Sequence, residues 1–441
     1  MTDTWRVMSS WGRTFRDRHL VSEPSFLDQA GEALSRFVNG GMSVLSYGLG
    51  RSYGDSCLNA DQGLIVTSRL DRIQAFDEAS GRIRVEAGLS LADLLEFAVP
   101  RGWFVPVTPG TKYVTVGGAV ANDVHGKNHH VAGTFARHVA RLALRRSDGE
   151  EIVCSPDQEA ELFGGTLGGL GLTGLILWVE LVLIPIRSAF IEFENIRFDS
   201  VDEFFDLSWE SRQWDYTVAW VDTIAGGRRL GRGIFSRGRH AADGPLQPHR
   251  TDGPLSVPLE APSFLLGQGF VRAFNLAYYK RPAATAKGRV HYDPFFYPLD
   301  RIRNWNRLYG SPGFYQYQCV VPADRARRTI PELLRHVARS GNASFLSVLK
   351  DFGEVSSPGL LSFPLPGTTL ALDFPNRGAR TLRLLDTLDE IVAEAGGRVY
   401  PAKDARLTAG VFQRAYPSWR ALERLRDPAF SSGFWRRVTG A

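Results

Sequence analysis

Apolar and polar residues alternate in short runs over the first part of the chain, and this pattern predicts β-strands. Residues 82–87 alternate strictly. Residues 42–46 and 63–67 are short and mainly apolar, which is typical of buried strands. We therefore expect several short strands, with an amphipathic run over residues 26–38 leading into the first glycine-rich segment.

A hairpin and a long buried strand are predicted further along. Runs of strand character over residues 139–146 and 151–155 flank an Asp-Gly pair at 148–149, which is a strong hairpin signal. The longest apolar stretch, residues 175–185, is interrupted by a glutamate and is too short to span a bilayer. We interpret it as a buried strand.

Helical signals are fewer. Ser90 and Asp93 have the spacing of a capping box at the start of a helix. Over residues 382–392 the apolar side chains lie on one helical face, and Gly396 and Gly397 end the pattern. Strands and helices do not alternate regularly, so the pattern favours an α+β fold.

The character of the sequence changes after residue 185, where aromatic and acidic residues become frequent, and we place a domain boundary near residue 189. Beyond it, residues 268–280 mix aromatic side chains with Arg272 and Lys280. Two interpretations fit this segment: a mobile lid that meets lipid, or an ordinary amphipathic helix.

Composition narrows the function classes. The 441 residues are 44% hydrophobic and 22% charged, which suits two or three packed units. The net charge of +5 suits an anionic substrate or a membrane surface, but the basic residues are scattered, so no nucleic-acid partner is expected. Cys57, Cys154 and Cys319 have neither disulfide nor metal-ligand spacing, so we expect no metal.

The first residues contain no apolar leader. We therefore expect a cytoplasmic protein, with peripheral contact at the inner membrane and a periplasmic location left open.

Two glycine-rich segments carry the clearest chemical signal. One is Gly-Leu-Gly-Arg-Ser-Tyr-Gly-Asp at residues 48–55, and the other extends over residues 109–130. Glycines let a backbone approach a bulky ligand, and their N–H groups can surround a diphosphate. The segment with Gly48 and Gly50 has neither the third glycine of the Rossmann fingerprint nor a helix directly after it, so a different dinucleotide site is indicated.

These two segments, with His-Gly-Lys-Asn-His-His at residues 125–130, resemble the vanillyl-alcohol-oxidase class of FAD enzymes. Later segments extend the resemblance to the branch of that class that oxidises polyprenyl-phosphoryl ribose. Those later segments are residues 295–300, 316–318, 344–350, 373–375 and 402–406.

The resemblance implies a two-subdomain PCMH-type FAD-binding domain with an inserted antiparallel-sheet substrate domain. The FAD-binding domain would comprise residues 7–189 and a C-terminal return over 397–441, and the substrate domain residues 190–396. The active site would then lie where the two meet, as small-molecule sites often do.

FAD is the cofactor that the resemblance implies. Covalently flavinylated members carry a histidine where this chain has Arg51, so noncovalent FAD is expected, with His125 as the alternative attachment point. The residues expected to hold FAD are Ser46, Tyr47, Gly48, Leu49, Gly50, Arg51, Ser52, Tyr53, Gly54, Asp55, Ser56, Gly110, Thr115, Val116, Gly117, Gly118, Asn122, Asp123, Val124, His125, Ile176 and Tyr400.

The implied reaction is oxidation of a CH–OH donor, the ribose 2'-hydroxyl of a polyprenyl-phosphoryl-β-D-ribose, to a 2'-keto intermediate. This is the first half of an epimerisation to the arabinose donor of cell-envelope glycan synthesis, which a separate NAD(P)H-dependent keto-reductase would complete. Lys403 is the expected base, and His125 competes for that role. Substrate would contact Tyr53, Lys127, Trp220, Gln316, Gln318, Lys350 and Lys403.

Two other functions remain open on the sequence alone. One is an FAD-dependent alditol or aldonolactone oxidase. The other is a lipid- or nucleic-acid-binding protein whose glycine segments are only structural.

Overall fold

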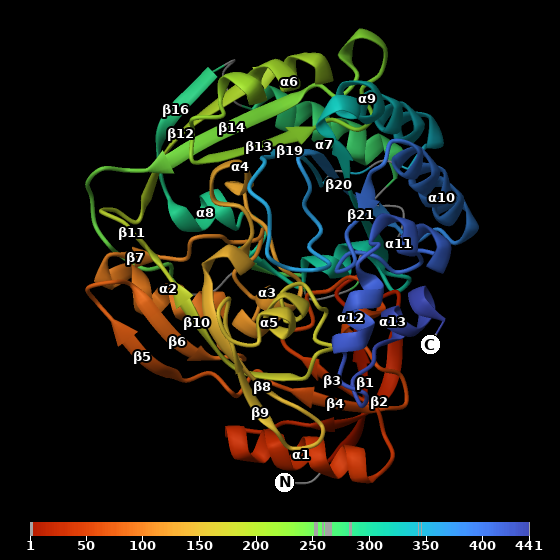
Figure 1. Cartoon of the computed structure of the whole chain (residues 1–441). Helices are drawn as coiled ribbons and strands as arrows, with labels where there is room; N and C mark the ends of the chain where they lie inside the picture. Colours follow the sequence, from red (N-terminus) through yellow and green to blue (C-terminus); the bar gives the residue numbers. More distant parts are fainter. Residues whose placement is uncertain are drawn as a thin grey trace.

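The computed structural model describes residues 3–250, 255–257, 260, 267–281, 285–342, 344 and 346–440. In Figure 1 the chain forms a lower unit, coloured red to yellow, and an upper unit, coloured green to cyan. The blue C-terminal segment runs from the upper unit down the side of the lower one. The fold is α+β, as the sequence predicts.

Two sheets form the lower unit. The first has the order β1-β2-β4-β3, in which only β1 and β2 are antiparallel neighbours, and the second, β5-β6-β10-β8-β9, is antiparallel throughout. The strands are β1 (Thr4–Ser9), β2 (Arg16–Ser22), β3 (Val44–Tyr47), β4 (Gly63–Val66), β5 (Ile73–Asp77), β6 (Arg82–Glu86), β8 (Val139–Arg145), β9 (Glu151–Cys154) and β10 (Leu175–Val182). The short strands and the hairpin predicted from the sequence are confirmed.

The apolar stretch after Gly174 is not one strand, which corrects the prediction for residues 175–185. β10 ends at Val182, and Ile184 and Pro185 form β11, which pairs with β7 (Trp103–Phe104) outside the main sheet. Proline cannot donate a ladder hydrogen bond, which is consistent with the strand leaving the sheet there.

The helices of the lower unit are short except for the first. Ser90 accepts a hydrogen bond from the Asp93 backbone N–H and caps the second helix, as predicted. The helices are α1 (Leu27–Asn39), α2 (Leu91–Ala98), α3 (Val116–Ala121), α4 (His129–Ala132) and α5 (Ala160–Thr166).

One large antiparallel sheet forms the upper unit, in the order β16-β12-β14-β13-β19-β20-β18-β21. Its strands are β12 (Phe190–Phe198), β13 (Tyr216–Val221), β14 (Gly233–His240), β16 (Thr285–His291), β18 (Phe314–Pro322), β19 (Ser347–Phe352), β20 (Gly367–Pro375) and β21 (Arg398–Val399). A separate parallel pair joins β15 (Leu255–Ser256) to β17 (Ile302–Arg303).

Helices cover one face of this sheet. The helices associated with the upper unit are α6 (Val201–Glu210), α7 (Gln268–Lys280), α8 (Tyr292–Phe296), α9 (Ala323–Ser340) and α10 (Ala379–Glu394). Side chains of α6, α9 and α10 form one core with alternate residues of the strands, such as Leu349, Leu370 and Leu372. Because successive residues of a strand point to opposite faces, the residues between these leucines face the lower unit.

The C-terminal segment joins the two units. After β21 the chain forms α11 (Ala409–Ala415), α12 (Trp419–Leu425) and α13 (Gly433–Thr439), and Phe430 pairs with Val44 of β3. β12 begins at residue 190, where the sequence change places a boundary. The division into 7–189, 190–396 and 397–441 stays a prediction.

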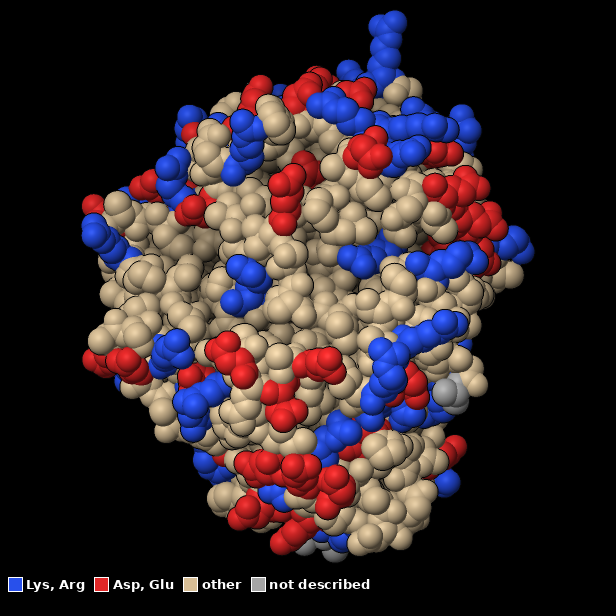
Figure 2. Space-filling view, viewed as in Figure 1, with Lys and Arg blue, Asp and Glu red and all other residues tan. Residues whose placement is uncertain are grey.

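Charged residues on the face shown in Figure 2 gather toward its upper and lower ends, while its middle is mostly uncharged. Both basic and acidic side chains lie at these two ends. Arg327 of α9, for instance, pairs with Asp206 of α6. Among the residues that the structure describes, none of the helices combines the length and apolarity needed to cross a membrane.

Candidate active site

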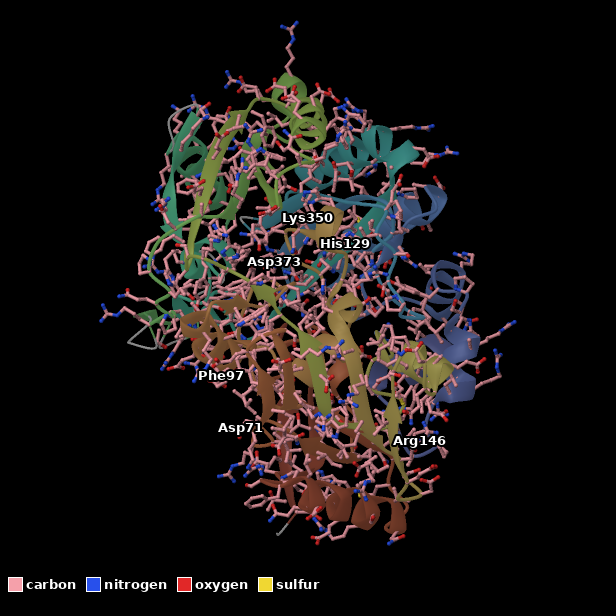
Figure 3. All side chains as sticks on the ribbon, turned by 60° about the vertical axis from the view of Figure 1, so that its left-hand side comes forward. Asp71, Phe97, His129, Arg146, Lys350 and Asp373 are labelled. Atoms are coloured by element: carbon pink, nitrogen blue, oxygen red, sulfur yellow. The ribbon has the colours of Figure 1, made fainter. Side chains whose placement is uncertain are left out.

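The face of the upper sheet opposite α6, α9 and α10 carries a row of aligned residues. Trp220 pairs with Val348, Val348 with Ala371, and Ala371 with Gln318, across four adjacent strands. In the rows on either side, Lys350 lies opposite Thr369, and Gln316 lies opposite Asp373. Figure 3 shows Lys350 and Asp373 near His129 between the units, with Asp71, Phe97 and Arg146 lower down.

The first glycine segment follows β3 and leads into a short helical turn at Asp55–Cys57. Gly50 has a φ of +62°, a left-handed conformation that other residues rarely adopt. A Cβ on Gly48 would lie 2.5 Å from Thr115 Oγ1, so the first segment closely approaches the second. Only a residue without a side chain permits that contact.

The second glycine segment contains α3. Thr115 is its N-cap and accepts a hydrogen bond from the Gly118 N–H at 3.1 Å. Gly117 packs on Ala87 of the lower sheet, where an added Cβ would lie 2.9 Å from the Ala87 Cβ. Gly110 has open space beside it, with no atom within 4 Å of an added Cβ.

Buried polar atoms around these segments suit a large polar ligand. Within the described part of the chain, Ser46 Oγ, Ser56 Oγ and His125 Nδ1 are buried without a hydrogen-bond partner. Such atoms are costly unless a ligand or water satisfies them. Together with the glycine contacts, they fit FAD bound along residues 46–56 and 110–125.

Other predicted FAD residues have partners of their own. Arg51 Nε donates to the Tyr113 carbonyl at 3.1 Å, and its guanidinium stacks on Trp11 at 4.0 Å from the ring centre. The Tyr400 hydroxyl donates to the Asn122 carbonyl at 2.9 Å.

The Asp123 carboxylate is enclosed by protein donors. It accepts hydrogen bonds at 2.5 Å from the Ser357 and Ser362 hydroxyls, and at 2.9 Å from the Ala136 N–H. Any contact of Asp123 with the cofactor is therefore left to its backbone.

The remaining predicted FAD residues differ in surroundings. Ile176 is buried in the core of the lower unit with Val116, and Val124 packs at the edge of that core. Leu49 is exposed. Tyr47 donates its hydroxyl to the Ser9 carbonyl, and Trp11 N–H donates to the Ser52 carbonyl.

The histidine and lysine run of the second segment meets the upper sheet. Gln318 Nε2 donates to His125 Nε2 at 2.9 Å, which leaves the His125 proton on the unpartnered Nδ1. Lys350 Nζ donates to the Gly126 carbonyl at 2.8 Å, and Lys127 Nζ donates to the Phe295 carbonyl.

His129 and His130 differ from each other. His130 Nε2 donates to the Trp214 carbonyl at 2.7 Å, which gives it a structural role. The His129 ring lies 4.5 Å from the ring of Phe352, and in the described residues neither of its nitrogens has a partner.

Lys403 lies beside Tyr53 of the first glycine segment. Its Nζ is 4.0 Å from the centre of the Tyr53 ring. The Tyr53 N–H donates to the Ala402 carbonyl at 2.9 Å, so the FAD segment and the Lys403 segment are joined by their main chains. Gln316 Nε2 donates at 2.6 Å to the buried Asp373 carboxylate.

Burial and charge perturb the titratable groups of the site. Burial lowers the pKa of Lys403 to about 8, although the neighbouring Asp373 carboxylate acts in the opposite direction. Burial, reinforced by the charges of Lys127 and Lys403, lowers the pKa of Lys350 to about 7. Burial alone lowers the pKa of Lys127 to about 8. Burial raises the pKa of Asp373 to about 7, against the hydrogen bond from Gln316.

The histidines stay neutral. Burial, and then the charge of Lys350, place the pKa of His125 well below its usual value. The same two causes lower the pKa of His129 to about 3. The lysines, rather than the histidines, therefore titrate in the physiological range.

Sequence reasoning assigned no role to Asp373, and it interpreted Arg437 as part of a short solvated basic cluster. Asp373 stands in the Asp-Phe-Pro segment, which is part of the family resemblance, so the sequence could have indicated it. Arg437 of α13 donates to both Asp55 carboxylate oxygens, at 3.0 and 2.7 Å, and to Asp404 at 3.0 Å. It thus ties the FAD segment to the residue after Lys403, a contact over 382 positions that local sequence cannot indicate.

Comparison with known proteins agrees with this geometry. Residues 20–155 match the family model described as FAD binding domain. The decaprenylphosphoryl-beta-D-ribose oxidase of Mycolicibacterium smegmatis is 37% identical over 99% of this chain and 98% of its own length. An uncharacterized protein of Streptomyces coelicolor is 36% identical over 79% of this chain and its whole length. The L-gulonolactone oxidase of Mus musculus is 27% identical over 40% of each chain.

The glycine contacts, the buried unpartnered atoms and the matched domain define an FAD-dependent oxidoreductase that acts on a hydroxyl group. The full-length similarity is more specific. The chain belongs to the decaprenylphosphoryl-beta-D-ribose oxidase family.

Proposed function

We propose that this protein oxidises the ribose 2'-hydroxyl of a polyprenyl-phosphoryl-β-D-ribose to the 2'-keto compound. The observation that carries the proposal is the end-to-end similarity to the mycobacterial oxidase, which includes the upper sheet as well as the FAD-binding part. The lactone oxidases of fungi and mammals align over less than half of this chain, so the alditol or aldonolactone alternative has weaker support.

Bound FAD supplies the hydride acceptor for the C2' hydrogen. The protein must then position the sugar and receive the hydroxyl proton as the carbonyl forms. Gln318 and Lys350 project from the sheet face toward the second glycine segment, where donors suit the sugar hydroxyls and the phosphate. Tyr53 and Gln316 lie on the Lys403 side, and Trp220 offers an apolar wall.

Lys403 is the residue we assign as base. A lysine with a pKa of about 8 is partly neutral near pH 7 and can take a proton from a bound hydroxyl. His125 is a weaker candidate, because its Nε2 lone pair already accepts from Gln318 and its pKa is well below the usual value. Its Nδ1–H is better suited to donate to a ligand oxygen.

The flavin spectrum tests the proposal. The purified holoprotein is mixed anaerobically with a soluble farnesyl-phosphoryl ribose, and the visible flavin band is followed in a stopped-flow instrument. We expect bleaching with this sugar and none with its 2'-deoxy analogue. Bleaching by arabinonolactone or an alditol instead of the ribose would refute the substrate assignment.

Two further parts of the proposal have separate tests. We propose noncovalent FAD, so acid precipitation should leave the flavin in the supernatant, and a yellow pellet would contradict this. We also propose that a separate NAD(P)H-dependent reductase consumes the keto product. Arabinose donor should therefore form only when such a reductase is added.

A further inference from the structure

Helix α7 exposes large apolar side chains and buries a polar one, unlike an ordinary surface helix. The residues it buries are Val271, Asn275 and Tyr279, at intervals of four. Asn275 Nδ2 donates to Asp222 at 2.8 Å, and the Tyr279 hydroxyl donates to Asp199 at 2.5 Å. Hydrogen bonds to two carboxylates therefore help to attach the helix to the upper unit, together with the buried Val271 side chain.

The outward side of α7 is apolar. Phe270 is 56% exposed and Leu276 is 40% exposed, while Phe274 and Tyr278 stack on each other and are 39% and 36% exposed. Four large apolar side chains exposed on one helix of thirteen residues are unusual for a surface facing only water.

The charges of this segment have one sign. Arg272 and Lys280 are exposed, Arg281 follows directly, and residues 268–281 contain no aspartate or glutamate. A helix with exposed aromatic and basic side chains suits the boundary between the headgroups and acyl chains of an anionic bilayer.

The helix also lies beside the site. The Tyr278 ring is 4.8 Å from the Trp220 ring, and Trp220 begins the row that continues through Val348 and Ala371 to Gln318. Val348 is 38% exposed, so apolar surface continues from the helix to the sheet face of the site.

We propose that α7 docks this protein on an anionic membrane surface through its outward side. The proposal rests on the proposed function in one respect: a lipid-linked sugar is embedded in a membrane by its tail. Docking through α7 would place the site next to that sugar, with the Trp220 and Val348 surface beside the tail.

Vesicle binding tests this directly. FAD-loaded full-length protein is sedimented with vesicles of phosphatidylcholine alone or with phosphatidylglycerol added. We expect binding to the anionic vesicles that weakens at high salt. Replacing Phe270→Gln together with Leu276→Gln keeps good helix formers and should lower the binding about tenfold or more.

Matched variants test whether a loss of vesicle binding is specific to α7. Trp209→Gln on α6 removes an apolar side chain that is 68% exposed and should leave vesicle binding unchanged. Arg272→Gln with Lys280→Gln should weaken binding to the anionic vesicles only. Absence of binding by the wild-type protein, or binding by the Phe270 and Leu276 variant equal to wild type, would overturn the proposal.

Flavin bleaching by soluble farnesyl-phosphoryl ribose tests the substrate assignment separately from membrane docking through α7. The variant with Phe270→Gln and Leu276→Gln should bleach at the wild-type rate with this substrate, because it needs no membrane. If the wild-type protein binds vesicles but is not bleached, the substrate assignment fails and membrane docking stands. If it is bleached but binds no anionic vesicle, docking fails and the function stands.

Discussion

Replacing Asp373→Asn should move the pH dependence of oxidation without removing the site. The change keeps the shape of the side chain and its acceptor for the Gln316 amide, which donates to Oδ1 at 2.6 Å. Above its own pKa of about 7 the Asp373 carboxylate carries a negative charge that raises the pKa of Lys403, and the variant lacks this charge. The pKa of Lys403 should therefore fall.

The size of the shift follows from general electrostatics. An opposite charge a few ångströms away moves a pKa by about 1–3 units. We expect the lower end, about one unit or about 1.4 kcal/mol, because Asp373 acts on Lys403 through its charge and not through a direct hydrogen bond. With the wild-type pKa of Lys403 at about 8, the base is neutral in about one molecule in ten at pH 7. In the variant that fraction would rise to about half.

The assay is the rate of flavin bleaching against pH with soluble farnesyl-phosphoryl ribose. A base acts when it is unprotonated, so the rate should increase with pH through the pKa of Lys403. In the variant this increase should occur at a lower pH. Asp351→Asn is the matched control, because Asp351 accepts from Ser208 of α6 and from Thr368, on the helix-covered face. An increase that stays in place or moves to higher pH in Asp373→Asn would refute the assignment of Lys403 as base.

Three other substitutions probe the same region. Lys403→Met should slow bleaching by about 10²–10⁴-fold while FAD stays bound, as judged from the rate and the flavin content; a near-normal rate would exclude it as base. Arg437→Met leaves the buried Asp55 and Asp404 carboxylates without their shared partner and should cost about 3–5 kcal/mol, measured by denaturant unfolding. Gly54→Ala places a Cβ 1.7 Å from the Asp404 carbonyl, so FAD affinity and melting temperature should both fall, and unchanged values would contradict this packing.

The sequence predicted those parts of the molecule that depend on local pattern. The alternation at 82–87 and the Ser90 cap are local, and both the strand and the cap are confirmed. The break between β10 and β11 was missed because β11 pairs with β7, a partner distant in the sequence. The role of Arg437 was missed for the same reason, because its two carboxylate partners are distant in the sequence and meet it only in the folded protein.

The arrangement also explains how one site can be precise although two units build it. The FAD segment and the Lys403 segment are joined by the Tyr53 to Ala402 hydrogen bond, by the close packing of Gly54, and by Arg437. Lys403 is therefore fixed relative to the FAD segment by main-chain contacts and a buried ion network. Lys350 and Gln318 lie on the upper sheet, so movement between the units would shift these two residues while Lys403 keeps its place beside the FAD segment.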